Sequence, residues 1–465
     1  MIQRRHTIVG RAAQLFLLLV GGALCCAGAE LPSPSRPVVA PDPKIAAVLS
    51  QISSDRIRRD INALVGFGTR STLSAQDQAA IAAGRGIGAA REWIKEQLTR
   101  YARDCGGCLE IVAEPFTQPA GERLPQPTVI TNVYAVMRGA DPLAAQRIVL
   151  VSGHYDSRNS DSADGEHDAP GANDDASGVA VSLECARVLS RLKFPATVIF
   201  LTVAGEEQGL FGSAQFAQMA DAGHWNIEAV LNDDIVGGNR GPGQDAGVVR
   251  VFSEGLPDTP DPAQLRLVRI AGLQDDSPSR QLARYVADVG RAYRLGIRAL
   301  LVFRQDRFLR GGDHESFNAQ GYAAVRFTEF REDFNRQHQN VRTEGGIEYG
   351  DLPKWVDYDY VARTARLNAA TLASLASAPA PPADVRILTA KLDNASTLQW
   401  SAVPGAAGYE ILWRATTSPE WEHARRVAGA TEATLDVSKD NVIFAVRALD
   451  AAGRRSLAVV PEPER

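Results

Sequence analysis

Five short polar segments of the chain carry the residue types that bind divalent metal ions. Histidine and carboxylate ligands, with no thiolate among them, suit zinc or a similar ion. The chain has only seven histidines, and two of them fall in these segments, each with an aspartate nearby. The segments contain His154 with Asp156, Asp174 with Asp175, Glu206 with Glu207, Asp233 with Asp234, and Asp313 with His314.

The acidic side chains of these segments need positive charge if they meet at one place. Carboxylates that share a site repel one another, and two metal ions with one bridging carboxylate would neutralise them. In the pair Glu206 and Glu207 we expect one glutamate to bind metal, while its neighbour stays free as a general base near the activated water. Each segment alone could be a solvated turn or a helix cap, so the prediction depends on all five occurring together.

Strand-like and helix-like patterns alternate over residues 45–376 and would position these segments. A near-continuous apolar run such as 196–205 is typical of a strand buried on both faces. The alternation predicts an α/β fold with a mostly parallel sheet sandwiched by helices, and ligands bind beyond the carboxyl ends of strands in such a sheet. The expected strands include 129–139, 147–153, 196–205, 227–237 and 322–329, and the expected helices include 177–192, 211–223 and 278–295.

The N-terminal residues have the pattern of a secretory signal peptide. Arg4, Arg5 and Arg11 accompany a short apolar run, and residues 27–29 form an A-x-A cleavage signal. We expect a signal peptide over residues 1–29, a Pro-rich linker over 30–44, and a secreted or periplasmic protein. No membrane span is expected after cleavage, because the apolar run is too short for a comfortable transmembrane helix.

Charge and cysteine content exclude some partners and predict one covalent bond. The formal net charge is -5 and no long basic tract occurs, so nucleic acid is not an expected partner.

Cys105 and Cys108 form a C-x-x-C pattern, for which a local disulfide is the first interpretation in a secreted chain. A redox motif or a zinc knuckle is the alternative. Cys185 lies in an apolar helical pattern and is predicted to be a buried thiol.

The C-terminal part of the chain has a different pattern from the rest. A linker over residues 377–382 precedes short alternating strands over 383–461, which predict a small all-β sandwich. The strand patterns in this part resemble a fibronectin type III repeat. No catalytic cluster occurs there, so a chain ending near Ser377 is expected to fold and to keep its chemistry. The sequence does not choose among several roles for the sandwich: it could bind a cell surface, a polysaccharide or substrate, or support the catalytic domain.

Together the five polar segments resemble the co-catalytic di-zinc aminopeptidases of bacteria, a family that also includes carboxypeptidases and glutaminyl cyclases. The resemblance is closest over residues 129–329 and extends more loosely over 45–375, so we assign 45–376 to the catalytic domain. It implies a zinc exopeptidase-like fold, two Zn²⁺ ions per chain and peptide substrates. The implied metal ligands are His154, Asp174, Glu207, Asp234 and His314, with Asp174 bridging the two ions.

The resemblance also implies roles for residues that lie beside the ligands. Glu206 is the implied general base, which takes a proton from water and later gives it to the leaving amine. Asp156 is implied to orient the ring of His154, and carboxylates in that position raise the basicity of a ligating histidine. Asp175 would follow Asp174 through a cis peptide bond.

Three departures from the family pattern bear on the site. Ile235 replaces the usual methionine and is apolar like it. Asp233 stands where an apolar residue is usual, which leaves it as an alternative to Asp234. His167 and Asp168 lie in a long loop and could compete as ligands, although a solvated loop is the favoured interpretation.

The expected function is a secreted zinc-dependent exopeptidase, and an aminopeptidase is the preferred form. A carboxypeptidase, a glutaminyl cyclase and a non-catalytic metal-binding scaffold are the alternatives. A full ligand set for two metals disfavours the cyclase, which typically uses one zinc, and an intact Glu206 disfavours the scaffold. The segment around His338 corresponds to a part of the family near the substrate.

Overall fold

The computed structural model describes residues 40–238, 240–257 and 260–464. The predicted signal peptide and most of the predicted linker over 30–44 lie outside these residues. The described residues belong to one compact unit, which contains a large sheet and two smaller β-sheets. Within them, no helix is both long enough and apolar enough to cross a membrane.

A mixed eight-stranded sheet lies at the centre of the larger part of the chain. In spatial order its strands are β1 (Glu110–Gln118), β2 (Thr128–Met137), β4 (Thr197–Val203), β3 (Arg147–His154), β5 (Asn226–Asp233), β8 (Ala324–Glu329), β6 (Val248–Ser253) and β7 (Arg298–Val302). The middle strands β4, β3, β5 and β8 are parallel, so their carboxyl ends share one edge. β1 and β2 form an antiparallel hairpin at the side of the sheet. These features confirm the predicted α/β fold class.

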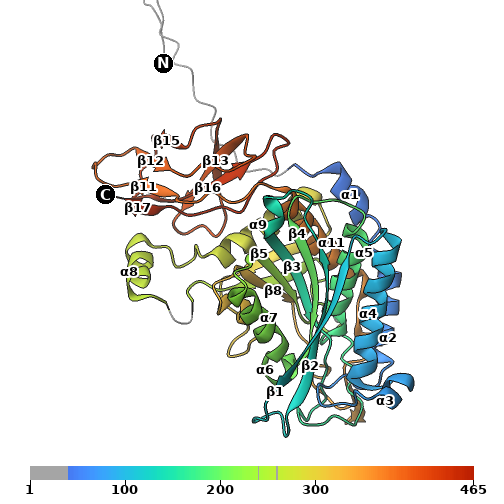
Figure 1. Cartoon of the computed structure of the whole chain (residues 1–465). Helices are drawn as coiled ribbons and strands as arrows, with labels where there is room; N and C mark the ends of the chain where they lie inside the picture. The colour runs from blue at the N-terminus through green and yellow to red at the C-terminus, as the bar shows by residue number, and fades with distance from the viewer. Residues whose placement is uncertain (1–39, 239, 258–259, 465) are drawn as a thin grey trace, which may run out of the picture. The chain divides into compact units, whose positions relative to one another are not determined.

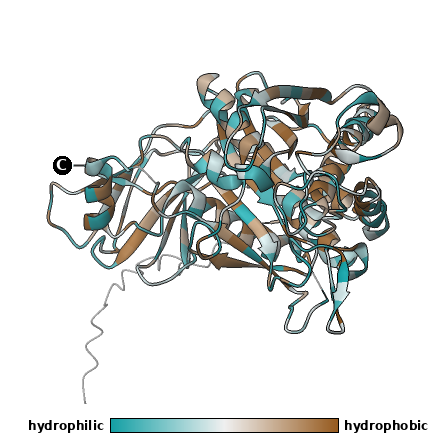
Figure 2. Cartoon of the chain, turned by 90° about the horizontal axis from the view of Figure 1, so that it is seen from below, coloured by the Kyte–Doolittle hydropathy of each residue, from teal (hydrophilic) through white to brown (hydrophobic). Residues whose placement is uncertain are grey.

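Helices cover both faces of this sheet (Figure 1). One face is covered by α1 (Pro43–Leu49), α2 (Ser54–Val65), α4 (Gly86–Asp104), α5 (Ala176–Leu189), α9 (Pro278–Tyr293) and α11 (Tyr358–Ser377), whose apolar sides share one core. The other face is covered by α7 (Phe211–Ala222) and α10 (His314–Asn318), around Phe216 and Phe317. All seven residues of β4 are buried, which explains its near-continuous apolar sequence. Figure 2 shows that the helices carry both hydrophobic and hydrophilic residues, as expected for helices with one buried face.

Several short elements connect these layers. They are α3 (Gln78–Ala82), α6 (Glu206–Gly209), α8 (Pro262–Ala271), β9 (Arg342–Glu344), β10 (Ile347–Tyr349) and the 3-10 turns η1 (Ala144–Gln146) and η2 (Pro353–Trp355). Of these, α6 matters most for the site, because it begins with the paired glutamates immediately after β4.

Beyond α11 the chain forms two small sheets that share a core. One contains β15 (Glu432–Leu435), β12 (Ser396–Gln399), β11 (Arg386–Leu388) and β17 (Glu462–Glu464), and the other contains β14 (His423–Val427), β13 (Gly408–Ala415) and β16 (Val442–Leu449). Leu398 and Leu435 of the first sheet lie in one buried cluster with Ile411 and Phe444 of the second. The two sheets therefore form the expected small all-β sandwich. Its relation to fibronectin type III stays a prediction.

Buried polar contacts join this sandwich to α9. Arg414 of β13 lies 2.6 Å from Asp276, and Arg284 of α9 lies 3.3 Å from the same carboxyl group. The indole N–H of Trp421 donates to Gln281 Oε1 at 3.2 Å. Removing one partner of a buried ion pair is costly, because the other charge stays buried and unpaired. These contacts speak against the expectation that the sandwich is dispensable.

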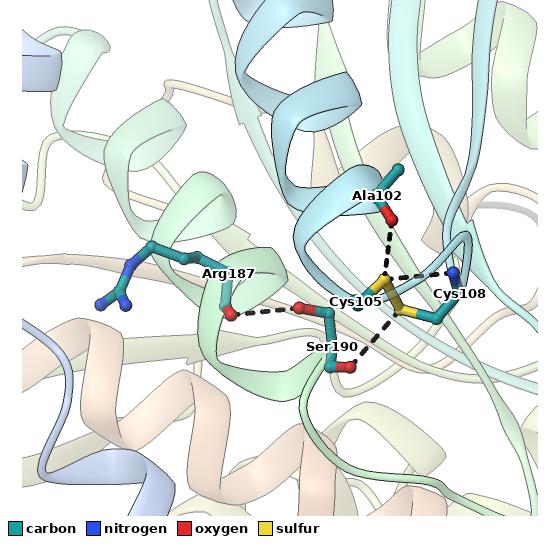
Figure 3. Close-up of a disulfide and its surroundings, with 5 residues drawn as sticks. All are labelled: Ala102, Cys105, Cys108, Arg187 and Ser190. Atoms are coloured by element: carbon teal, nitrogen blue, oxygen red, sulfur yellow. Dashed lines mark hydrogen bonds between the residues drawn. A yellow bond between two sulfur atoms is a disulfide. The ribbon is translucent and has the colours of Figure 1, made fainter.

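Cys105 and Cys108 form the predicted local disulfide, at the end of α4. The backbone N–H of Cys108 donates to Cys105 Sγ at 3.1 Å, and Cys108 Sγ lies 3.4 Å from the carbonyl oxygen of Ser190. Figure 3 shows both contacts beside the bridge. Ser190 is the C-cap of α5, so the bridge lies between two helices that pack on the same face of the sheet. Cys185 is a free, buried thiol, as predicted.

Candidate metal centre

The polar segments meet at the shared carboxyl edge of the parallel strands. His154 is the last residue of β3, Asp234 directly follows β5, and Glu206 is the first residue of α6 after β4. Gly205 has a φ of 80°, in the left-handed region that favours glycine, and this allows the sharp turn from β4 into α6. The order of the parallel strands thus brings together side chains that are far apart in the sequence.

Two histidines lie on opposite sides of the Asp174 carboxylate. His154 Nε2 is 3.1 Å from Asp174 Oδ1 and 3.7 Å from Asp234 Oδ1. His338 Nε2 is 2.9 Å from Asp174 Oδ2 and 3.1 Å from Glu207 Oε2. The five side chains therefore form two sets of three, and Asp174 belongs to both.

The donor atoms of both sets fit zinc. Two ligands of a tetrahedral zinc, each about 2.0–2.1 Å from the ion, lie roughly 3.3 Å apart, close to the separations here. Within the described chain, Glu207 Oε1 and Asp234 Oδ1 are buried and have no hydrogen-bond partner, and the Nε2 atoms of His154 and His338 face only carboxylate oxygens. Buried polar atoms are rarely left unpaired, so their convergence is best explained by a ligand that binds nitrogen and oxygen.

The electrostatics of the site also favour bound cations. Burial, followed by the neighbouring carboxylates of Asp234 and Glu207, raises the pKa of Glu206 well above its usual range. Burial is likewise the main reason that the pKa of Asp313 rises to about 7. Burial alone would lower the pKa of His338, but Glu207 and Asp174 outweigh it and raise this pKa to about 10. A pocket that favours positive charge so strongly suits divalent metal ions.

Asp156 lies directly behind the two sets of ligands. Its Oδ1 is 3.4 Å from His154 Nδ1, on the side of the ring that faces away from Asp174. Its carboxylate also accepts the backbone N–H groups of Glu206 at 3.4 Å and Glu207 at 3.2 Å. Asp156 therefore contacts a ligating residue of one set and the turn that carries a ligand of the other. This position suits the orienting role implied by the sequence.

Asp175 and Asp233, the sequence neighbours of the candidate ligands Asp174 and Asp234, make hydrogen bonds outside the two sets of ligands. Asp175 Oδ2 accepts the backbone N–H of His154 at 3.0 Å, and the Asp174–Asp175 peptide bond is cis, as the resemblance implied. Asp233 Oδ1 accepts a hydrogen bond from Asn368 Nδ2 at 2.9 Å, on α11. Of the two adjacent aspartates at the end of β5, only Asp234 faces His154.

The structure differs from the sequence expectation at one ligand position. His314 is fully buried at the start of α10, where its Nε2 lies 2.9 Å from the carbonyl oxygen of Gln305, and it belongs to neither set. His338, from the irregular segment between β8 and β9, occupies the expected place beside Glu207. Of the Asp-His pair after β7, His314 thus makes a local contact with the Gln305 backbone, while both carboxylate oxygens of Asp313 are buried. His167 is 83% exposed and pairs with Asp164, in agreement with a solvated loop.

Three further residues hold the ligands and were not predicted. Arg326 of β8 is fully buried, with Nη2 2.9 Å from Asp234 Oδ2. Asp351 Oδ2 accepts the backbone N–H of Asp174 at 2.7 Å, and Gln337 Nε2 donates to Asp174 Oδ2 at 3.0 Å. An arginine in the middle of a strand with apolar residues on both sides was a signal that a buried acid lies nearby. Nothing in the local sequence marks Asp351 or Gln337.

A cleft of about 390 Å³ opens over the candidate ligands. Its floor contains the carboxylates of Asp174, Glu206, Glu207 and Asp234. The apolar side chains of Leu210 and Leu309 and several arginines form the walls. The cleft is large enough for one or two amino-acid residues of a substrate, and the candidate metal ligands lie at its base.

The chain belongs to peptidase family M28, whose model matches residues 132–353. A probable zinc metalloprotease of Pyricularia oryzae is 45% identical over 457 residues, which cover 94% of this chain and 89% of that protein. A probable zinc metalloprotease of Leptosphaeria maculans is 44% identical over 430 residues, which cover 91% of this chain and 98% of that protein. The chain is therefore a zinc metallopeptidase. Both of these relatives are fungal, whereas the sequence motifs resembled bacterial enzymes.

Solved structures share the fold at lower sequence identity. The structure of the LapA aminopeptidase of Legionella pneumophila matches with a TM-score of 0.50 and 20% identity, over 72% of this chain and 75% of that chain. A second structure of LapA matches with a TM-score of 0.51, also at 20% identity, over 72% and 76% of the two chains. This likeness concerns the fold alone, and it agrees with the zinc exopeptidase-like architecture expected from the sequence.

Proposed function

We propose that this zinc metallopeptidase is a di-zinc aminopeptidase that releases N-terminal residues from peptides. The observation that supports the proposal is the position of Asp174, whose two carboxylate oxygens lie 3.1 Å from His154 Nε2 and 2.9 Å from His338 Nε2. One carboxylate that faces two separate histidines is suited to bridge two ions. Asp234 would complete the set of His154, and Glu207 would complete that of His338.

Glu206 is the proposed general base. When bound, zinc polarises the scissile carbonyl and lowers the pKa of a water molecule. An oxygen of Glu206 lies within 4.8 Å of donor atoms of His154 and Asp234, so its carboxylate is close enough to receive a proton from water at that place. The same oxygen can then give the proton to the leaving amine. Asp156 holds Glu206 in place through its backbone N–H group.

Exopeptidase action requires that the end of the substrate be recognised. We propose that the free α-amine of the substrate lies beside Glu207 and His338, because the side chain of His338 is 31% exposed whereas that of His154 is fully buried. The Glu207 carboxylate favours a free amine over a blocked N-terminus. When the α-amine is held at Glu207, only the first peptide bond of the substrate lies beside Glu206. The apolar wall formed by Leu210 and Leu309 suits an aliphatic first side chain.

Metal analysis combined with a small substrate panel tests this function. We expect two zinc ions per purified chain, cleavage of aminoacyl chromogenic substrates, and no cleavage of their N-acetylated forms. Equal cleavage of blocked and free substrates would contradict the aminopeptidase proposal. A single tightly bound metal, with no gain in activity on adding zinc, would contradict the two-ion site.

We also propose that the mature protein is secreted or periplasmic. The disulfide between Cys105 and Cys108 supports this, since such bonds persist mainly in oxidising compartments. N-terminal sequencing of the exported protein should give Glu30 as the first residue. Recovery of the protein only inside the cell, with its N-terminus intact, would contradict export.

For residues 383–461 we propose a fibronectin type III-like module that binds a cell surface or a polysaccharide. The four-stranded and three-stranded sheets of the sandwich support this proposal. Retention of the full chain on insoluble polysaccharide, or on cells, is the expected result. Failure to bind any of these would leave support of the catalytic domain as its role.

A further inference from the structure

Arginine side chains form much of the wall of the catalytic cleft. The cleft floor carries the carboxylates that would be bound to metal, so the charge of the wall decides which substrates are attracted. The arginines that line the cleft are Arg123, Arg158, Arg307, Arg310 and Arg326.

Three of these arginines are held by acidic side chains of the protein itself. Arg326 lies 2.9 Å from Asp234 and 3.1 Å from Asp306, which is not one of the floor carboxylates. Arg307 and Arg310 lie 3.2 Å and 2.7 Å from Glu332. Their charges are largely compensated, so they serve mainly to fix the cleft wall.

The other two arginines contact only backbone oxygen atoms. Arg158, four residues after His154, directs Nε at the carbonyl of Asn159 at 3.2 Å and Nη2 at that of Ser160 at 3.5 Å. Arg123 lies in the turn between β1 and β2, with Nη1 3.5 Å from the carbonyl oxygen of Glu207. Among the residues that the structure describes, neither has a carboxylate partner within ion-pair distance.

The proposed metals change the charge balance of this cleft. Two divalent ions would neutralise the four carboxylates of the floor, which otherwise would offset the arginines. The charges of Arg123 and Arg158 then remain, on side chains that reach solvent. Clefts lined by one sign of charge concentrate ligands of the opposite sign.

We propose that Arg158 and Arg123 form an anion-binding subsite that selects peptides with a carboxylate close to the scissile bond. This inference rests on the proposed exopeptidase function. The planar guanidinium group binds a carboxylate through two parallel hydrogen bonds, which gives orientation as well as attraction. Arg123 lies beside the Glu207 backbone and Arg158 shortly after His154, so the subsite borders the reacting bond from two elements.

Two sources can supply the carboxylate, and a set of matched dipeptides distinguishes them. Leu-Ala-amide has none, Leu-Asp-amide has one on its side chain, and Leu-Ala has one at its C-terminus. We expect kcat/KM to be about tenfold higher for at least one of the two anionic substrates than for Leu-Ala-amide, as for hydrogen bonds to a charged group. The preferred anionic substrate identifies the source.

Variants of the two arginines test the assignment. In Arg158→Gln and Arg123→Gln the ratio of kcat/KM for the preferred anionic substrate to that for Leu-Ala-amide should fall, and in the double variant it should approach one. Arg269→Gln, an exposed arginine on α8, is the matched control and should keep the wild-type ratio. In the wild type, raising the salt concentration should lower the ratio, because exposed charges are screened.

The outcomes separate this inference from the proposed function. If the wild type cleaves all three dipeptides with similar kcat/KM values, the subsite is overturned. The proposed aminopeptidase activity is then still supported. A ratio that is high in the wild type and unchanged in both variants overturns the assignment to these arginines. Cleavage of N-acetyl-Leu-Asp-amide as fast as of Leu-Asp-amide contradicts the aminopeptidase itself. If a variant fails to fold, the salt dependence of the wild-type ratio tests the subsite instead. A ratio that falls with rising salt supports a charged subsite, and a ratio that does not change with salt contradicts it.

Discussion

Asp156 Oδ2 accepts a hydrogen bond from the backbone N–H of Glu207 at 3.2 Å, although the two residues follow different strands. The same carboxylate lies 3.4 Å from His154 Nδ1 and accepts the hydroxyl of Thr72 at 3.0 Å. One side chain therefore ties a candidate ligand of the first metal to the turn that carries a ligand of the second. The two halves of the centre are not positioned independently.

This connection predicts the effect of Asp156→Asn. The amide keeps the size of the side chain but loses the negative charge and one acceptor, so both the His154 ring and the α6 turn should loosen. Removing such a supporting group typically costs about 10–100-fold in metal affinity or activity. Zinc titration and turnover measure the effect. Asp161→Asn, in an exposed loop, is the control, and equal behaviour of both variants would contradict the orienting role.

The roles of Glu206 and Glu207 should separate on mutation. Glu206→Gln removes the proton acceptor but no proposed ligand, so zinc content should stay near the wild-type value while turnover falls by about 10²–10⁴-fold. Glu207→Gln should lower zinc affinity at one position, and excess zinc should partly restore its activity. Metal content and turnover are measured side by side. Loss of zinc from Glu206→Gln alone would reverse the assignment.

His338, and not His314, should control the second metal position. His338→Ala removes the only histidine of the set formed with Asp174 and Glu207, so the variant should retain about half of the wild-type zinc. His167→Ala, in an exposed loop, should retain all of it. His314→Gln should change stability more than zinc content, because the ring contacts the Gln305 backbone. Full zinc occupancy in His338→Ala would contradict the assignment of His338 as a ligand of the second metal ion.

Stability at acid pH should depend on Glu410. Burial alone would raise the pKa of Glu410, but Arg447 and Arg455 outweigh it and hold this pKa at about 2. The folded pKa lies below that of the unfolded chain, so the contribution is present above about pH 4.5 and is lost as the pH falls towards 2. It amounts to about 3 kcal/mol.

Urea unfolding at pH 7, 5 and 3 measures this contribution. Glu410→Gln leaves Arg455 without its carboxylate and Arg447 with only Asp288 at 3.8 Å, so it should lower the free energy of unfolding at pH 7, and the difference from the wild type should shrink at pH 3. A difference that is constant with pH would show that the ion pairs of Glu410 do not govern acid stability. Glu462→Gln, on the exposed strand β17, is the control and should show little effect at any pH.

A chain shortened at Ser377 should fold poorly, contrary to the expectation from the sequence. The cut would expose α9, leave Asp276 without its partner Arg414, and remove the Pro419 carbonyl oxygen that accepts a hydrogen bond from Arg284 Nε at 2.6 Å. Circular dichroism and size-exclusion chromatography of the shortened chain should show aggregation or loss of cooperative unfolding. Arg414→Ala in the full chain should cost about 3–5 kcal/mol through the same contact. A soluble, active shortened chain would contradict this prediction.

Much of the fold and of the candidate site could be predicted because parallel strands have a regular geometry. Buried strands leave apolar runs, and their carboxyl ends share one edge, so His154, Glu206, Glu207 and Asp234 could be placed together from sequence order alone. The Asp-His pair after β7 misled the prediction, since it resembles a ligand motif while His314 points to the backbone of Gln305.

Except for Arg326, the residues that the sequence did not assign to the metal centre lack a local signal. His338 lies in an irregular segment without periodicity, and only tertiary contacts bring it to Asp174. Asp351 is far from Asp174 in the sequence, and its hydrogen bond to that backbone cannot be inferred from either neighbourhood. The sandwich appeared dispensable because its contacts with α9 involve Arg414 and Asp276, two charged residues that look like surface residues until their burial is known.

The hairpin of β1 and β2 has a consequence for how proteins of this kind can diversify. Its turn carries Arg123, yet no proposed metal ligand comes from the hairpin, which is an antiparallel addition at the edge of the sheet (Figure 1). Edge turns tolerate substitution and insertion far better than the ends of central strands. Natural variation in this turn can therefore change which peptides are preferred while the hydrolytic chemistry is inherited unchanged.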